Sequence, residues 1–279
     1  MALAKGRALV LLCRPLNLLG IGLGVATSIK LAGGERAFDG VDVAVVAGWV
    51  LLAAGGYVLD DARDSESDAR FHPARPIPSG LVSRELAFRI GPSLLAAGAS
   101  VLIFGYARLW VVGAATALVL YGYGGGLKRV SGLAANATVS ALLVLAVMSG
   151  GFRSGQWRAV AVLGLIVFWT NLGREIAMDI VDVEADRSQG YRTIPLVHGL
   201  RTARALAGAF LILGGCSGYL LTATGSVAPL GFAIGLTVVN LGLVSTAVLP
   251  LMTGRGDPRR VVTSAKAVMF ADLVLTAST

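Results

Sequence analysis

The sequence predicts an all-α membrane protein, a polytopic bundle of about nine transmembrane helices. Hydrophobic residues occupy 55% of the 279 positions and charged residues only 14%, whereas a soluble domain carries roughly 25% charged residues. The mean hydropathy is +0.75. The apolar residues form continuous runs, most of them near the roughly 20 residues that cross a bilayer, and they lack the alternation of a membrane barrel.

Nine apolar runs give the expected helices in chain order. They cover residues 8–29, 43–59, 86–107, 109–127, 132–152, 159–173, 205–228, 229–252 and 261–278. Lys266 and Asp272 interrupt the last run, and Arg14 with Pro15 interrupts the first, which argues against a cleavable signal peptide. No linker divides the chain. Residues 1–279 are therefore expected to form one membrane domain with Asp-rich loops near 60–84 and 174–204.

The basic residues predict the orientation. With nine spans and a cytoplasmic N-terminus, only five of the 24 Lys and Arg residues lie in the opposite loops, which leaves 19 on the cytoplasmic side. The five are Lys30, Arg36, Arg108, Arg153 and Arg158. The net charge of +8 thus indicates positive-inside topology and polyanion binding in a cell membrane. No basic cluster with stacking aromatics supports nucleic-acid binding.

A carboxylate pattern, D-x-x-D-x-x-x-D, occurs twice. The two copies are Asp61, Asp64 and Asp68, then Asp179, Asp182 and Asp186, with 118 positions between counterparts. On a continuous helix these offsets place three side chains within an arc of about 60°. Both copies lie at the cytoplasmic exits of predicted helices, where the helix dipole disfavours negative charge. Each copy continues into Arg-x-Ile-Pro, at Arg75 and at Arg192.

Repelling carboxylates at two helix ends predict bound cations rather than a merely solvated surface. Mg²⁺ fits best, because it takes oxygen ligands and commonly binds through carboxylates together with substrate phosphates. His72 and His198 lack the spacing of zinc ligands. Cys13 and Cys216 lie in different apolar runs and are expected to be small buried residues, not a disulfide.

Other polar residues in or beside the apolar runs are candidates for an anion site. Lys128 and Arg129 follow the glycine-rich stretch 121–126, although they also suit a simple membrane anchor. Arg14 and Asn17 lie one turn apart within the first run, and such intramembrane polar groups commonly mark functional sites. Asn136 and Asn171 are weaker candidates, since either could simply bond a neighbouring helix. The 37 glycines suit close helix packing, for example at Gly20-x-x-x-Gly24 and Gly122-x-x-x-Gly126.

On these motifs the chain resembles the UbiA superfamily of intramembrane prenyltransferases. The stretch 60–80 matches the family's N-D-x-x-D-x-x-x-D motif and its R-P-I-P-S-G segment, and 174–195 matches R-E-I-x-K-D-I-x-D-x-E-x-D followed by G-x-R-T-(L/I)-P. Tyr123 with Lys128 resembles the family's tyrosine-to-lysine loop. Arg14-Pro15-Leu16-Asn17 resembles its first-helix R-P-x-N. The resemblance covers essentially the whole chain.

The resemblance implies an Mg²⁺-dependent enzyme that ionises an isoprenyl diphosphate, transfers the prenyl group to a small aromatic or lipid-like acceptor and releases diphosphate. Four aspartates would be catalytic: Asp61, Asp64, Asp179 and Asp182. The metal-binding set would be these four with Asp60, Asp68 and Asp186. Lys128, Arg75, Arg192 and Tyr123 would bind diphosphate, and Arg14 and Asn17 would bind substrate. The acceptor, the donor chain length and the oligomeric state stay open.

Two departures from the family's motifs leave alternatives. Asp60 stands where the family usually has asparagine, and Met178 stands where the second motif often has lysine. A UbiA-type terpene cyclase would need the donor but no separate acceptor. A carboxylate-based transporter would place charges near mid-membrane and break helices in paired positions, whereas these acids gather at one face.

Overall fold

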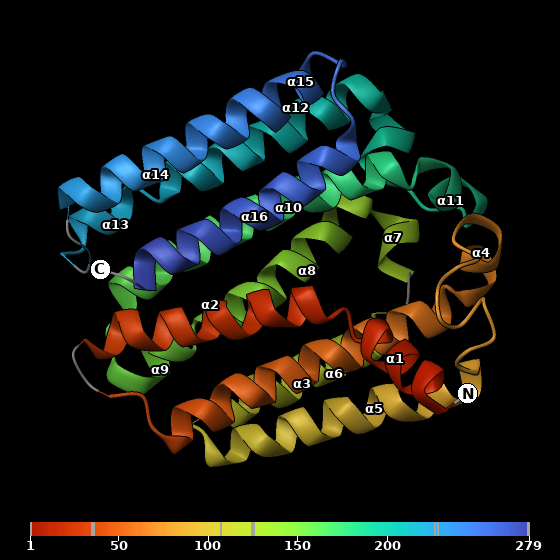
Figure 1. Cartoon of the computed structure of the whole chain (residues 1–279), viewed down its shortest axis with the longest axis horizontal. Helices are drawn as coiled ribbons and strands as arrows, with labels where there is room; N and C mark the ends of the chain where they lie inside the picture. The colour runs from red at the N-terminus through yellow and green to blue at the C-terminus, as the bar shows by residue number, and fades with distance from the viewer. Residues whose placement is uncertain are drawn as a thin grey trace. The chain divides into compact units, whose positions relative to one another are not determined.

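The protein is helical throughout the part of the chain that the computed structural model describes. The described residues are 2–34, 37–106, 108–123, 126–225, 227 and 229–277. Every regular element in these ranges is a helix, as Figure 1 shows. The all-α prediction is therefore confirmed.

The chain forms two compact units. The first comprises Met1–Val25 and Phe38–Gly126, and the second comprises Ala26–Ala37 and Leu127–Thr279. Helix α2 (Pro15–Gly33) crosses the boundary between them. The other helices of the first unit are α1 (Ala2–Leu12), α3 (Gly40–Arg63), α4 (Ser65–Phe71), α5 (Arg84–Val101), η1 (Leu102–Phe104) and α6 (Leu109–Gly122). Whether the whole chain is one domain stays a prediction.

The second unit contains the longer helices of the carboxy-terminal half. They are α7 (Gly126–Val130, beginning at the boundary), α8 (Gly132–Val147), α9 (Ser149–Ser154), α10 (Trp157–Val181), α11 (Val183–Ser188), α12 (Ile194–Ser217), α13 (Leu220–Ala223), α14 (Pro229–Leu243), the π-helical η2 (Val244–Val248), α15 (Leu249–Met252) and α16 (Pro258–Ala277).

Seven helical stretches within the described residues are long and apolar enough to cross a membrane. They correspond to α2, α3, α5, α8 with α9, α10, α12 with α13, and α14 through α15. Helix α6 is apolar but has only 14 residues. Helix α16 has 20 residues but includes charged positions. The predicted polytopic helical protein is confirmed, and the count of nine spans is approximate.

Glycines bring α3 and α5 close together in the first unit, where the two helices run side by side (Figure 1). A Cβ added at Gly55 would lie 2.8 Å from the Gly91 carbonyl oxygen, and one at Gly98 would lie 2.7 Å from the Gly48 carbonyl oxygen. Neither distance leaves room for a methyl group. The predicted close packing through glycine exists, but not at Gly122 and Gly126, where the described residues offer no atom within 4 Å of an added Cβ.

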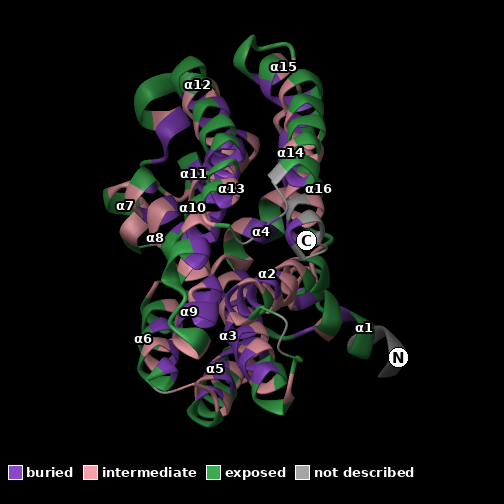
Figure 2. Cartoon of the chain, turned by 90° about the vertical axis from the view of Figure 1, so that its left-hand side faces the viewer, coloured by how far each residue is buried: buried purple, intermediate pink, exposed green. Residues whose placement is uncertain are grey.

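Helix α10 is the buried centre of the second unit and packs on α8, α12 and α16. Buried residues continue along most of its length, from Ala159 to Ile180 (Figure 2). Gly173 and Gly214 sit where α10 and α12 approach: an added Cβ would lie 2.8 Å from the Ala207 carbonyl oxygen or 2.3 Å from the Thr170 hydroxyl, respectively. Because α10 is fixed on several sides, polar residues near its end have well-defined neighbours.

Helix α12 is interrupted near its start. Gly199 has φ 82° and ψ 161°, a conformation that side-chain-bearing residues rarely adopt. The short segment Ile194–His198, which includes the Ile-Pro of the Arg192-x-Ile-Pro sequence, therefore forms its own turn. The predicted apolar run began only at residue 205 because Arg201 and Arg204 stand in the first turns after this break.

Candidate active site

Both aspartate motifs have the same local structure, in which the middle aspartate ends one helix and begins another. Asp64 is the residue between α3 and α4, and Asp182 is the residue between α10 and α11. Their φ/ψ values, −82°/0° and −97°/16°, fall in the sparsely populated bridge region. Neither carboxylate caps the helix that follows it.

Backbone hydrogen bonds repeat around these two breaks. The Asp64 N–H donates to the Asp60 carbonyl at 2.9 Å, and the Asp182 N–H donates to the Met178 carbonyl at 2.9 Å. The prediction of one continuous helical stripe is thus wrong. The bridge-region residue redirects the chain, so the third aspartate of each motif lies on a separate short helix.

The first carboxylate cluster comprises Asp60, Asp61, Asp64 and Asp68. Asp61 is buried in the last turn of α3, where Arg14 Nη2 donates to its Oδ1 at 2.5 Å. The same guanidinium lies 3.5 Å from Asp60 Oδ2 and 5.0 Å from the centre of the Tyr57 ring. The predicted anion-site residue Arg14 therefore neutralises the first aspartate of the motif.

Arg14 reaches this position through an unusual backbone. It lies between α1 and α2 with φ 55°, a left-handed conformation that is uncommon outside glycine. Its carbonyl accepts the Asn17 N–H at 2.8 Å, which begins α2. Asn17 thus supports the turn through its backbone.

Arg75 joins the two buried aspartates of the first cluster, Asp61 and Asp68. Its Nη1 donates to both oxygens of Asp68, at 2.8 and 2.7 Å, and lies 3.9 Å from Asp61 Oδ1. The loop that carries Arg75 is closed by the Ser79 N–H donating to its carbonyl at 3.0 Å. Two guanidinium groups, those of Arg14 and Arg75, therefore form ion pairs with the first cluster.

The second carboxylate cluster comprises Asp179, Asp182 and Asp186. Lys128 Nζ donates to Asp179 Oδ1 at 3.2 Å and lies 3.8 Å from Asp186 Oδ1. Burial acts to lower the pKa of Lys128, but the two carboxylates outweigh burial and raise that pKa above its ordinary value. One ammonium group here occupies the role that two guanidinium groups have in the first cluster.

Asp179 also receives a hydrogen bond from a neighbouring helix. Asn136 Nδ2, on α8, donates to Asp179 Oδ2 at 2.7 Å, and both residues are 2% exposed. Each oxygen of the Asp179 carboxylate therefore accepts one hydrogen bond, from Lys128 at Oδ1 and from Asn136 at Oδ2. Asn136 was a weaker candidate from the sequence, and the structure brings it into the second cluster.

The Asp186 carboxylate has the fewest hydrogen-bond partners of the second cluster's buried aspartates. Its Oδ2 is buried without a well-formed hydrogen bond among the described residues, and the buried Thr193 hydroxyl beside it is the polar group that acts on this carboxylate. Burial raises the pKa of Asp186 to about 7, although the Lys128 ammonium acts to lower it. An orphaned buried oxygen within an all-oxygen donor set fits a hard divalent cation such as Mg²⁺.

Arg192 and Tyr123 are placed differently from Arg75. The Arg192 side chain is exposed, and its backbone instead joins the segments beside Lys128. Its N–H donates to the Lys128 carbonyl at 2.8 Å and its carbonyl accepts the Gly132 N–H at 3.0 Å. Tyr123 is half-buried at the end of α6. Gly124 and Gly125 of the same predicted loop lie outside the described residues.

The remaining predictions concern metal geometry and cysteine. Within the described ranges, no group of three or more His, Cys, Asp or Glu side chains is arranged to hold a metal ion. The buried carboxylates engage Arg14, Arg75 and Lys128 instead. Cys13 and Cys216 are both free thiols, as predicted, although Cys216 is exposed rather than buried.

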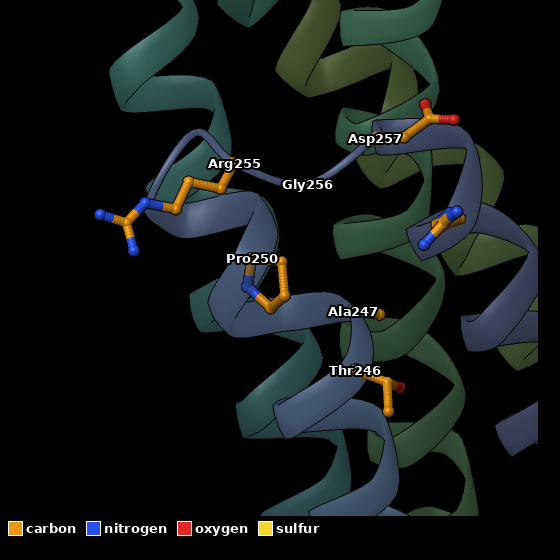
Figure 3. A pocket seen from close by; sticks show the side chains of 7 residues that line it. Thr246, Ala247, Pro250, Arg255, Gly256 and Asp257 are labelled. Carbon is orange, nitrogen blue, oxygen red and sulfur yellow. The ribbon is translucent and has the colours of Figure 1, made fainter.

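A separate pocket of about 370 Å³ lies in the second unit, between the end of α14–α15 and the start of α16 (Figure 3). Thr246, Ala247 and Pro250 line it from one helical stretch, and Arg255, Gly256 and Asp257 line it from the following loop. It shares no residue with the predicted site.

The chain matches the model of the UbiA prenyltransferase family over residues 22–271. The chain belongs to the UbiA prenyltransferase family. It is 33% identical over 292 aligned positions to the digeranylgeranylglyceryl phosphate synthase of Ignicoccus hospitalis, covering 98% of this chain and 91% of that protein. It is 34% identical over 230 positions to the enzyme of the same name from Methanothermobacter thermautotrophicus, covering 81% of this chain and 79% of that protein.

Solved structures of the family share the fold. A digeranylgeranylglyceryl phosphate synthase structure superposes with a TM-score of 0.76 at 21% identity, covering 98% of each chain. The UbiA homologue of Archaeoglobus fulgidus bound to GPP and Mg²⁺ superposes with a TM-score of 0.69 at 15% identity, covering 98% of this chain and all of that one. The protein is thus a multi-pass membrane prenyltransferase of the UbiA family. The cyclase alternative is not favoured, and the family match gives no support to the transporter.

Some contributors to the site were missed by sequence reasoning. Ser140 carries no signal in an apolar helix, yet it is 0% exposed and bonds both Asn136 and Asn171. Thr193 and Tyr191 flank Arg192, and the Lys128 ammonium lies 5.7 Å from the Tyr191 ring centre. Their position inside the second family motif was the only available clue.

Proposed function

We propose that the protein transfers a geranylgeranyl group from geranylgeranyl diphosphate to the free hydroxyl of geranylgeranylglyceryl phosphate. The observation that carries this proposal is the match to two digeranylgeranylglyceryl phosphate synthases, at 33–34% identity over most of each chain. The name of their product implies both substrates. A glyceryl phosphate lipid also belongs to the lipid-like acceptors expected from the sequence.

The proposed reaction exchanges one carbon–oxygen bond for another. The bond between the donor's first carbon and its diphosphate oxygen breaks, and the bonding electrons leave with diphosphate. The acceptor hydroxyl oxygen then bonds that carbon and loses its proton. The main electrostatic task is therefore to stabilise negative charge on the departing diphosphate.

Two sets of residues would perform this task. The carboxylates Asp61, Asp64, Asp179 and Asp182, supported by Asp60, Asp68 and Asp186, would hold Mg²⁺ against the diphosphate, and bound Mg²⁺ would supply charge neutralisation there. The orphaned Asp186 Oδ2 and the oxygen-only donor set support this assignment. Magnesium in the related Archaeoglobus fulgidus structure supports it as well.

Cations of this chain would bind the diphosphate directly. Arg14 and Arg75 contact carboxylates of the first cluster, and Lys128 contacts those of the second. Each cation is therefore held beside carboxylates that would bind the metal–diphosphate complex. The exposed Arg192 and the half-buried Tyr123 would add donors from flanking loops, and Asn17 would contribute to substrate binding. The 19 basic residues on one side of the predicted topology support a cytoplasmic position for both aspartate motifs.

The proposal is tested with purified protein, Mg²⁺ and three donors: geranyl, farnesyl and geranylgeranyl diphosphate. Each donor is incubated without acceptor and with geranylgeranylglyceryl phosphate, and the lipid products are identified by mass spectrometry. We expect ether formation to require the glyceryl phosphate acceptor and to be fastest with geranylgeranyl diphosphate. A cyclic hydrocarbon formed without acceptor would overturn the transferase assignment, and transfer only to aromatic acceptors would overturn the proposed substrate.

A further inference from the structure

We propose that Asn136 is a positioning residue for the reaction, held in place by Ser140 and Asn171, and that it fixes the Asp179 carboxylate for metal binding. The inference rests on the proposed function, because it assumes that Asp179 is a metal ligand. It adds residues outside both family motifs. All four residues are between 0 and 2% exposed.

Hydrogen bonds join the side chains of Asn171 and Ser140 to the backbone of Asn136, and a separate side-chain bond joins Asn136 to Asp179. Arg174 donates through Nε and Nη2 to Asn171 Oδ1, at 3.2 and 3.1 Å, so the amide oxygen of Asn171 is committed. Its Nδ2 then donates to Ser140 Oγ at 3.0 Å. Ser140 Oγ in turn donates to the main-chain carbonyl oxygen of Asn136, one turn earlier in α8, at 2.8 Å.

Ser140 and Asn171 thus hold the α8 backbone at Asn136, and the Asn136 side-chain amide makes the contact with Asp179. Arg174 is itself paired with Glu175, so its charge is balanced within α10. The result is two polar connections between α8 and α10, one from Asn171 to Ser140 and one from Asn136 to Asp179. Two connections at different heights fix both the axial position and the rotation of α10 against α8.

A purely structural pair of helix contacts would not need to end on a reactive carboxylate. Asn136 occupies Asp179 Oδ2 and Lys128 occupies Oδ1. A carboxylate offers about four acceptor positions, so a metal ion can bind while Asn136 stays in place.

Manganese binding measures this role without turnover. Mn²⁺ prefers the same oxygen ligands as Mg²⁺ and gives an electron paramagnetic resonance signal, so its affinity can be titrated in the presence of inorganic diphosphate. Partners that orient metal ligands change metal affinity by about 10–100-fold when they are replaced. We expect Asn136→Leu, which keeps the number and branching of side-chain heavy atoms but removes the donor, to weaken Mn²⁺ binding by about 10–100-fold.

Asn240→Leu is the matched control. Asn240 Nδ2 also bonds a neighbouring helix, at the Gly215 carbonyl oxygen, but it ends on backbone rather than on a carboxylate. We expect this variant to bind Mn²⁺ like the unmodified protein. If both variants weaken binding equally, the effect is general helix loosening and the proposal fails.

A double-mutant cycle separates positioning from packing. Ser140→Ala should weaken Mn²⁺ binding several-fold in the unmodified protein and have almost no further effect beside Asn136→Leu, because both act on one carboxylate. Additive effects would contradict the proposal. Ser140→Ala alone also decides the question should Asn136→Leu fail to fold, since normal binding would then overturn it.

Asp179→Ala distinguishes this inference from the proposed function. Loss of Mn²⁺ binding in Asp179→Ala with normal binding in Asn136→Leu would refute the positioning role alone. Normal binding in Asp179→Ala would refute the metal-ligand assignment on which both proposals depend.

Discussion

The ammonium group of Lys128 lies 3.2 Å from Asp179 and 3.8 Å from Asp186, so one cation bridges the first and third aspartates of the second motif. In the first motif the corresponding aspartates, Asp61 and Asp68, are bridged by Arg75 at 3.9 and 2.7 Å. Arg14 adds a second cation there. The two clusters therefore share a plan but differ in the number of cations.

Replacing Lys128 should affect catalysis strongly. Lys128→Met removes the only side-chain cation within 4 Å of Asp179 or Asp186 in the described residues, and we expect turnover to fall by about 10²–10³-fold, the usual loss for one charge-stabilising donor. Arg129→Met is the control, because Arg129 is the exposed neighbour. Diphosphate release at saturating Mg²⁺ measures both. Equal losses in the two variants would contradict the assigned role of Lys128.

The middle aspartates should be essential. Asp64→Ala and Asp182→Ala should each abolish turnover while leaving membrane insertion intact, because they stand at the helix breaks of both motifs. Glu66→Ala and Glu184→Ala are matched controls, since these exposed acids occupy equivalent positions in the two copies. Turnover near normal in Asp64→Ala or Asp182→Ala counts against the metal assignment.

Asp60 and Asp61 should respond differently to the same change. The Asp60 side chain is 48% exposed, whereas that of Asp61 is 8% exposed. We expect Asp60→Asn to alter stability by about 1 kcal/mol or less and to retain turnover, because exposed ion pairs contribute little and the family motif has asparagine there. Asp61→Asn should lose turnover. A Mg²⁺ titration of both variants tests this, and inactivity of Asp60→Asn would show that the extra acid is required.

Met178 should not tolerate the lysine of the family motif. Its side chain packs against the apolar cluster that includes Leu172, Ile176 and Ile180. Met178→Lys should therefore lower the midpoint of thermal unfolding without raising turnover, while Met178→Leu should stay close to the unmodified protein. An increase in turnover with Met178→Lys would instead show that this chain lacks a diphosphate contact.

The close contact between α3 and α5 gives a test of the fold. A Cβ at Gly91 would lie 2.6 Å from Leu59 Cγ, so Gly91→Ala should destabilise the protein by about 1–3 kcal/mol. At Gly122 the described residues leave space, so Gly122→Ala should be tolerated. Thermal unfolding in detergent compares the two variants, and equal midpoints would contradict the α3–α5 geometry.

The sequence predicted the helical membrane class and the duplicated aspartates because both are local signals. Hydropathy over about 20 residues identifies spans, and a repeated spacing needs no partner to be recognised. The breaks at Asp64 and Asp182 could not be predicted, since the same spacing also suits a continuous helix. Their bridge-region backbone depends on how the following short helix folds back.

Hydrogen bonds between residues far apart in the sequence were the main feature of the site that the sequence did not predict. The Asn171–Ser140 bond joins residues 31 positions apart, and serine in an apolar helix commonly bonds its own backbone. Likewise, the resemblance implied equivalent roles for Arg75 and Arg192, but only the Arg75 side chain pairs with an aspartate in the described residues. Lys128 takes that place in the second cluster because α7 brings it beside Asp179.

The central claim is tested most directly by the stoichiometry of one reaction. Purified protein is incubated with Mg²⁺, geranylgeranyl diphosphate and limiting geranylgeranylglyceryl phosphate, and released diphosphate and ether product are measured together. The account predicts one diphosphate released for each ether formed, with release ending when the acceptor is consumed. Continued diphosphate release after the acceptor is exhausted, with a hydrocarbon or prenyl alcohol as product, would contradict it.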